Sequence, residues 1–107
     1  METIQIFKQK KAPYKRVYFD LPTISSLNYC LRHNGDTFER ITLLYVFAKK
    51  FGLDYIVKRL GRMSRIYEKF GTPFGDDYYN FLNNEIITYV KENYDANAVE
   101  FVKNYMI

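Results

Sequence analysis

The sequence predicts a mainly α-helical fold at the margin of the α+β class: a compact bundle of about five to six helices with a short N-terminal β-hairpin or arm. Three observations support this prediction. Two short segments near the N-terminus alternate apolar and polar residues, as half-buried strands do. From Leu21 onward, apolar residues instead recur every three to four positions, the spacing of helices with one buried face. Gly, Pro, Asn and Asp residues divide this part into segments of helix length.

The first elements are two predicted strands, TIQIFK at 3–8 and RVYFD at 16–20. The polar loop between them, QKKAPY, contains Pro13, so the two strands are expected to pair as a hairpin. A two-stranded ribbon is marginally stable alone and has to pack on the helices. The alternative is that the first dozen residues form a loose arm.

A first helix is predicted after Leu21, in the segment PTISSLNYCLRHNG. Ile24, Leu27 and Leu31 share one of its faces. Thr23 is the candidate N-cap, and Asn34-Gly35 is the expected stop.

A second helix is predicted in DTFERITLLYVFAKKFG, residues 36–52. Asp36 and Glu39 have the spacing of a capping box, and Lys49, Lys50 and Gly52 close the segment. Its apolar residues surround most of the helix: Phe38, Ile41, Leu44, Tyr45, Ala48 and Phe51 form one stripe, and Leu43, Val46 and Phe47 another. A helix covered from several directions has this pattern, so it is expected to be the central buried helix.

The next segment, DYIVKRLGRMSRIYEKF at 54–70, has two interpretations. Over residues 53–70 it resembles the helix-turn-helix of many small DNA-binding proteins, with a turn at Gly61 and a basic second helix that would enter the major groove. It departs from that pattern at Val57 and Arg62, where the family prefers a small and an apolar residue. The apolar positions listed next continue through Gly61 without a change of phase: Ile56, Leu60, Met63, Tyr67 and Phe70. This favours one amphipathic helix, in which the glycine costs about 1 kcal/mol relative to alanine.

Two further helices are predicted after the turn-rich GTPFG linker. Asp76 or Asp77 is the candidate cap of the first, and its apolar stripe is Tyr78, Phe81, Leu82, Ile86, Tyr89 and Val90, although residues 86–90 alone would suit a strand. Asp95 is the candidate cap of the last, with Ala98, Phe101, Val102, Tyr105 and Met106 on one face.

Charge is divided unevenly along the chain. Residues 1–70 carry 14 Lys or Arg against six Asp or Glu, a net charge of +8, and residues 71–107 carry two against six, a net charge of −4. We therefore expect a single domain over 1–107, made of a basic hairpin or arm (1–20), a basic helical part (21–70) and acidic C-terminal helices (76–107). Such a division is typical of a polyanion-binding face, of contacts between subunits, or of internal compensation.

The candidate nucleic-acid-binding residues form two groups. On a continuous helix Lys58, Arg62, Arg65 and Lys69 recur at four, three and four positions, with Arg59 beside them, and only Glu68 interrupts this region with negative charge. The N-terminal group is Lys10, Lys11, Lys15 and Arg16, with Lys8 adjoining. Both groups are suited to phosphate contact, and Tyr14 and Tyr18 to stacking on unpaired bases or to packing on the core. The plainer alternative is a solvated basic surface.

Signals of catalysis and of metal or cofactor binding are weak. Cys30 and His33 lie three residues apart, but the apolar surroundings of Cys30 favour a buried, inert thiol. No phosphate-cradling loop, dinucleotide fingerprint or multi-cysteine zinc pattern occurs, so no catalytic residue, metal or cofactor is predicted. A single cysteine favours a reducing, cytoplasmic setting, and the longest apolar run, LLYVFA, is too short for membrane insertion.

The composition, rich in Tyr, Ile and Lys and without Trp, is similar to that of small orphan proteins of AT-rich viral or plasmid genomes, including filamentous and rod-shaped viruses of hot-spring archaea. That resemblance implies work in the host cell and transfers no site residues. The expected function is non-enzymatic nucleic-acid binding through the cationic helix face. The alternative is a protein-interaction or assembly module, a homodimer or host-protein binder, in which the C-terminal helix packs between subunits.

Overall fold

The structure, a computed structural model, describes residues 3–33 and 35–106 and has the predicted architecture. Five helices follow a two-stranded antiparallel hairpin, which confirms the predicted fold class. The elements are β1 (Thr3–Lys8), β2 (Arg16–Asp20), α1 (Leu21–Arg32), α2 (Thr37–Phe51), α3 (Asp54–Phe70), α4 (Asp76–Asn93) and α5 (Ala96–Lys103). The expected stop of the first helix at Asn34-Gly35 includes Asn34, which lies outside the described residues, and α1 itself ends at Arg32.

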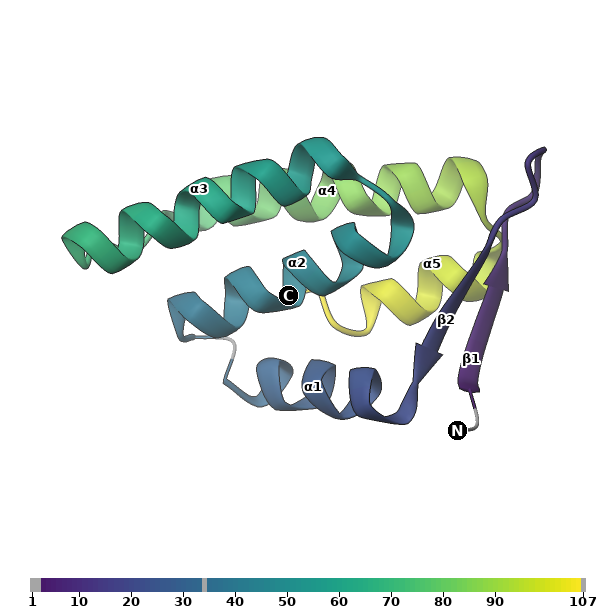
Figure 1. The fold of residues 1–107 in the computed structure, drawn as a ribbon, viewed down its shortest axis with the longest axis horizontal. Coiled ribbons are helices and arrows are strands. Elements are labelled where there is room, and N and C mark those ends of the chain that lie inside the picture. The colour runs from purple at the N-terminus through teal and green to yellow at the C-terminus, as the bar shows by residue number, and fades with distance from the viewer. Residues whose placement is uncertain (1–2, 34, 107) are drawn as a thin grey trace.

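The helices surround α2, as its sequence predicts. Figure 1 shows α2 between α1 on one side and α3 with α4 on the other, while the hairpin closes the end of the bundle next to α5. Residues on several faces of α2 are buried: Ile41, Leu43, Leu44, Phe47, Ala48 and Phe51. Two members of its predicted stripe are not, because Phe38 and Tyr45 face outward with about two-fifths of their surface exposed, 39% and 40%. Phe38 still packs edge-on against Tyr67 of α3, with ring centroids 4.8 Å apart.

The hairpin is part of the core, which confirms the hairpin alternative over the loose arm. Its register pairs Ile6 with Tyr18 and Phe7 with Val17. Because side chains alternate between the faces of a strand, Phe7 and Phe19 point inward while Ile6 and Tyr18 stay exposed. Phe19 meets four other rings, those of Phe7, Phe47, Phe51 and Phe101, with centroids 4.9 to 6.1 Å from its own.

Two of the capping predictions need correction. Asp20, not Thr23, is the N-cap of α1, and its carboxylate accepts a hydrogen bond from the Thr23 N–H at 3.0 Å. Neither Asp76 nor Asp77 caps α4, whose N-cap is Gly75; the two carboxylates lie in the first turn, where the helix dipole favours negative charge. The predicted caps of α2 and α5 are confirmed, since the carboxylates of the residues preceding these helices accept from the N–H groups of Phe38 and Ala98.

The last two helices bury most of their predicted faces within the same chain. Residues 86–90 belong to α4, so the helical interpretation of this segment is confirmed. Its stripe is rotated slightly from the prediction, because Tyr79 is buried and Phe81 is exposed. On α5, Ala98 and Val102 are fully buried, and the partly buried Phe101 contacts Phe7. The apolar face of α5 therefore already packs in the core of its own chain.

Candidate nucleic-acid interface

The longest basic surface is built on α3, which runs unbroken from Asp54 to Phe70 through Gly61. This confirms the single amphipathic helix predicted from the uninterrupted apolar spacing. Ile56, Leu60 and Met63 are buried against the bundle and fix how the helix is rotated. The stripe ends before its predicted last member, because the final turns of α3 extend past the ends of α1 and α2 (Figure 1) and leave Phe70 66% exposed.

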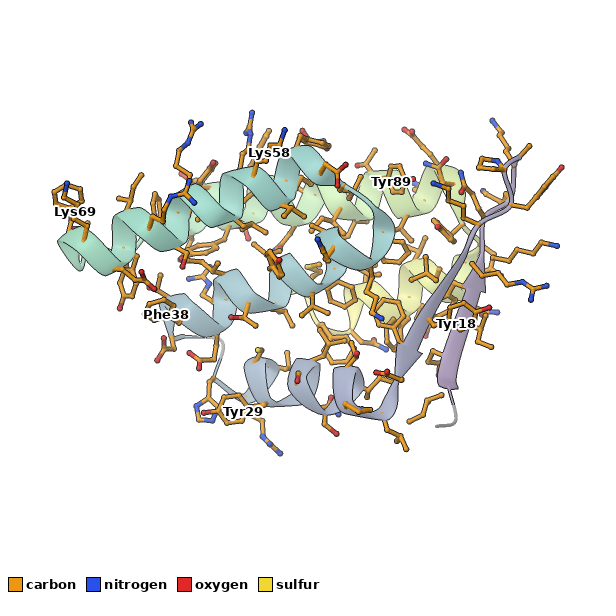
Figure 2. The ribbon with its side chains drawn as sticks, viewed as in Figure 1. Tyr18, Tyr29, Phe38, Lys58, Lys69 and Tyr89 are labelled. Carbon is orange, nitrogen blue, oxygen red and sulfur yellow. The ribbon has the colours of Figure 1, made fainter. Side chains whose placement is uncertain are left out.

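The five predicted basic residues of α3 are all exposed: Lys58, Arg59, Arg62, Arg65 and Lys69. With 100° per residue, four of them cluster opposite the buried face, and Figure 2 shows Lys58 and Lys69 on the outer edge of the helix. The fifth, Arg59, turns toward α4, where its guanidinium lies 5.9 Å from the centroid of the Phe81 ring. We call the four outward residues the α3 basic face. It is a cationic ridge about three turns long.

The second predicted group, Lys10, Lys11, Lys15 and Arg16, is exposed at the tip of the hairpin and the start of β2. The tip is held in place by backbone hydrogen bonds. The Gln9 N–H donates to the Lys15 carbonyl at 2.8 Å, and the Lys10 N–H donates to the Asn93 carbonyl, at the end of α4, at 2.7 Å. The Lys10 ammonium also donates to the Lys91 carbonyl at 3.3 Å. The hairpin group is therefore carried on a docked element.

The structure does not merge the two basic groups. The hairpin tip lies by the C-terminal end of α4, whereas the α3 basic face runs away from it toward the opposite end of the molecule (Figures 1 and 2). A cavity of about 300 Å³ lies where the hairpin meets the turn after α2, and Lys15, Arg16, Lys50, Tyr89 and Tyr94 are among its lining residues. The sequence did not single out Lys50 or Tyr89 as site residues, because their spacing suited a helix end and a buried stripe.

Carboxylates pair with little of this charge. Among the residues that the structure describes, the only ion pair joins Arg40 to Asp76, with Nη1 and Oδ1 2.9 Å apart. The same guanidinium lies 3.9 Å from the ring centroid of Tyr79, whose phenol has its pKa raised by burial. Arg40 is thus engaged by other residues of the chain, whereas the basic residues of α3 and the hairpin tip have no carboxylate of the described chain within 4.0 Å.

The structure offers no catalytic pairing of Cys30 with His33. Cys30 is buried, and desolvation, reinforced by Glu39, raises the pKa of its thiol. The exposed His33 instead packs its ring on Tyr29, with centroids 4.4 Å apart. Within 3–33 and 35–106, no group of three or more His, Cys, Asp or Glu side chains is placed to hold a metal ion.

No family model, no curated protein and no solved structure matches this chain. Of the helices that the structure describes, none combines the length and hydrophobicity that a bilayer-spanning helix needs.

Proposed function

We propose that the protein is a non-enzymatic nucleic-acid-binding protein that contacts phosphates through the α3 basic face. One observation carries the proposal: Lys58, Arg62, Arg65 and Lys69 project together from one continuous helix, whose opposite side is buried in the core as far as Met63. Basic side chains aligned in this way neutralise successive phosphates and release counterions. Exposed charges of one sign with no carboxylate partner repel each other, and a polyanion relieves that repulsion.

The test is fluorescence anisotropy of labelled DNA and RNA, double- and single-stranded, at several salt concentrations. Replacing Arg62 and Arg65 together by Ala is expected to weaken binding to all sequences alike. The logarithm of the binding constant falls linearly with the logarithm of the salt concentration, and loss of two phosphate contacts should make this slope shallower by about 1.4 to 1.8. The result that would refute the proposal is an unchanged affinity and salt slope in this variant.

A matched control keeps the change in net charge but moves it off α3. Arg32 and Lys103 are exposed basic residues on α1 and α5. Figure 1 shows α1 on the side of the bundle opposite α3. The Arg32→Ala, Lys103→Ala double variant should bind as the parent does. Equal losses in the two double variants would mean that only the overall charge of the protein matters, and the assignment to α3 would be wrong.

A second candidate function, self-association as a homodimer, is favoured by the outer face of the hairpin. Ile4, Ile6 and Tyr18 are exposed there, with Leu21 at the following helix start, and Ile6 stands opposite Tyr18 in the sheet. Exposed apolar side chains on a two-stranded ribbon are typical of contact surfaces. Sedimentation velocity of the parent and of Ile6→Lys tests this: a dimer in the parent that becomes a monomer in the variant is expected, and a monomeric parent would refute it.

A further inference from the structure

The cavity between the hairpin, the end of α2 and the end of α4 is lined by cations and tyrosines without a carboxylate. Lys15 and Arg16 come from the hairpin, Lys50 from the last turn of α2, and Tyr89 and Tyr94 from the end of α4. Basic residues from elements far apart in sequence thus line one concave site. No Asp or Glu is among the lining residues, although the charge of Lys50 also acts on the Asp20 carboxylate, which lies outside the lining.

The two tyrosines differ in what they offer a ligand. Tyr94 is buried and packs its ring against Phe51, with centroids 5.0 Å apart, so it forms the floor of the cavity. Tyr89 is only partly buried, and Figure 2 shows it on α4 at the end nearest the hairpin tip. A partly exposed ring beside cations is suited to stacking on a nucleobase while the cations hold a phosphate.

The shape of the site limits the size of its ligand. A volume of about 300 Å³ lies at the lower end of the range for small-molecule pockets, which fits a single nucleotide. Gly52 also lines the cavity, in the left-handed conformation with φ of 74°, which a side chain would strain. Its backbone therefore borders the site without a Cβ.

We propose that this cavity is a nucleotide-phosphate pocket, in which Lys15 and Lys50 hold one phosphate and Tyr89 stacks on the attached base. In this inference the nucleotide is part of a bound strand, and that part rests on the proposed function. The same chemistry also fits a free nucleotide. The pocket lies by the hairpin tip, so it gives the hairpin group a specific contact that is separate from the α3 basic face.

Lys50→Gln and Lys49→Gln form a matched pair for testing the pocket. The two lysines are adjacent in the last turn of α2, but Lys49 is exposed and does not line the cavity. For a labelled 12-nucleotide single strand in the anisotropy assay, Lys50→Gln should weaken binding about fivefold or more and lower the salt slope by about 0.7, while Lys49→Gln stays within about twofold. Circular dichroism and thermal melting of both variants check the fold, because the Lys50 ammonium lies 5.9 Å from the Phe19 ring centroid.

Tyrosine variants test the stacking step. Tyr89→Phe keeps the ring and should bind as the parent does, whereas Tyr89→Ala should weaken strand binding about fivefold or more. Equal losses in the two variants would refute stacking and implicate the hydroxyl.

Further arms identify the source of the phosphate. The first arm compares strands that carry a 5′-phosphate with strands that carry a 5′-hydroxyl. If Lys50→Gln weakens the binding of both strands, an internal phosphate occupies the pocket. If it weakens the binding of the phosphorylated strand alone, the terminal phosphate occupies the pocket. The second arm measures whether AMP displaces a fluorescent AMP analogue from the protein. Displacement that is lost in Lys50→Gln but kept in Lys49→Gln would support the pocket, with a free nucleotide as its ligand. If neither strands nor AMP distinguish Lys50→Gln from Lys49→Gln, the pocket is refuted.

The failure of each proposal has its own signature. If the Lys50 tests refute the pocket but the Arg62→Ala, Arg65→Ala double variant still loses affinity, the proposal for α3 is supported and only the pocket is wrong. If Lys50→Gln loses affinity but the Arg62→Ala, Arg65→Ala double variant does not, the pocket is supported and the proposal for the α3 basic face is refuted.

Discussion

Replacing Phe19 by Ala tests whether the hairpin belongs to the cooperative core. Phe19 has no exposed surface, and four aromatic rings lie within 6.1 Å of its ring centroid. Removing a buried phenylalanine costs about 3–5 kcal/mol through lost burial and a residual cavity, and lost ring pairs move the value toward the upper end. For a domain whose free energy of unfolding is about 5–15 kcal/mol, this is a large fraction.

Urea denaturation followed by circular dichroism at 222 nm measures this loss. With a slope of about 1.5 kcal/mol per molar urea, the midpoint should fall by about 2–3 M. Tyr18→Ala is the control on the same strand, because Tyr18 faces outward and its loss should cost less than about 1 kcal/mol. Phe19→Leu, a milder change, keeps the comparison usable if the alanine variant does not fold. Equal effects of the Phe19 and Tyr18 changes would refute the docking of the hairpin.

Three other predictions concern the helices. Gly61→Ala should raise the melting temperature by a few degrees, because alanine stabilises a helix interior by about 1 kcal/mol relative to glycine. The new Cβ would meet only Arg65 Nη1, at an ordinary contact distance of 3.7 Å. A lower melting temperature would indicate a turn at this glycine. The hydrogen bonds from Thr23 lower the pKa of the Asp20 carboxyl below 3.8. Wild type should therefore exceed Asp20→Ala in urea midpoint by an amount that is constant well above pH 3.8 and that is lost as the pH falls through the lower folded-state pKa. An advantage that does not shrink on acidification would contradict this. Burial and the raised pKa should make Cys30 react slowly with a thiol reagent at pH 8 in the native protein and rapidly in urea; rapid labelling of the folded protein would show an exposed thiol.

Local patterns were enough to predict the elements of this fold. The strands at 3–8 and 16–20 have the predicted bounds, and the continuous helix through Gly61 followed from the unbroken apolar spacing. Apart from the caps of α1 and α4, the errors concern which neighbours cover each helix. Phe70 continues the stripe of α3 but lies beyond the end of the bundle, and Tyr79 rather than Phe81 is buried because α4 packs on α2 along a slightly rotated face. The periodicity of apolar residues predicts which side of a helix is buried, but it does not predict where the neighbouring helices that cover this side end.

The candidate site divides in the same way. The α3 basic face lies within one helix, so spacing alone predicted which side chains share a face. The pocket, in contrast, is assembled from a hairpin, a helix end and a distant helix, and no local signal joins Lys50 to Tyr89. Sequence position suggested ordinary roles for both residues, one as a basic residue near a helix C-terminus and one as part of an apolar stripe. Only the tertiary fold places them around one cavity.

The aromatic contacts between the hairpin and α5 have a consequence for synthesis on the ribosome. Phe7 and Phe19 leave the ribosome early, but Phe101, which contacts both rings, is made about 80 residues after Phe19. At about 5–20 residues per second, the hairpin waits roughly 4–16 s before that partner exists. During this time its inward face lacks part of its cover, so the nascent chain exposes aromatic surface of the kind that chaperones bind.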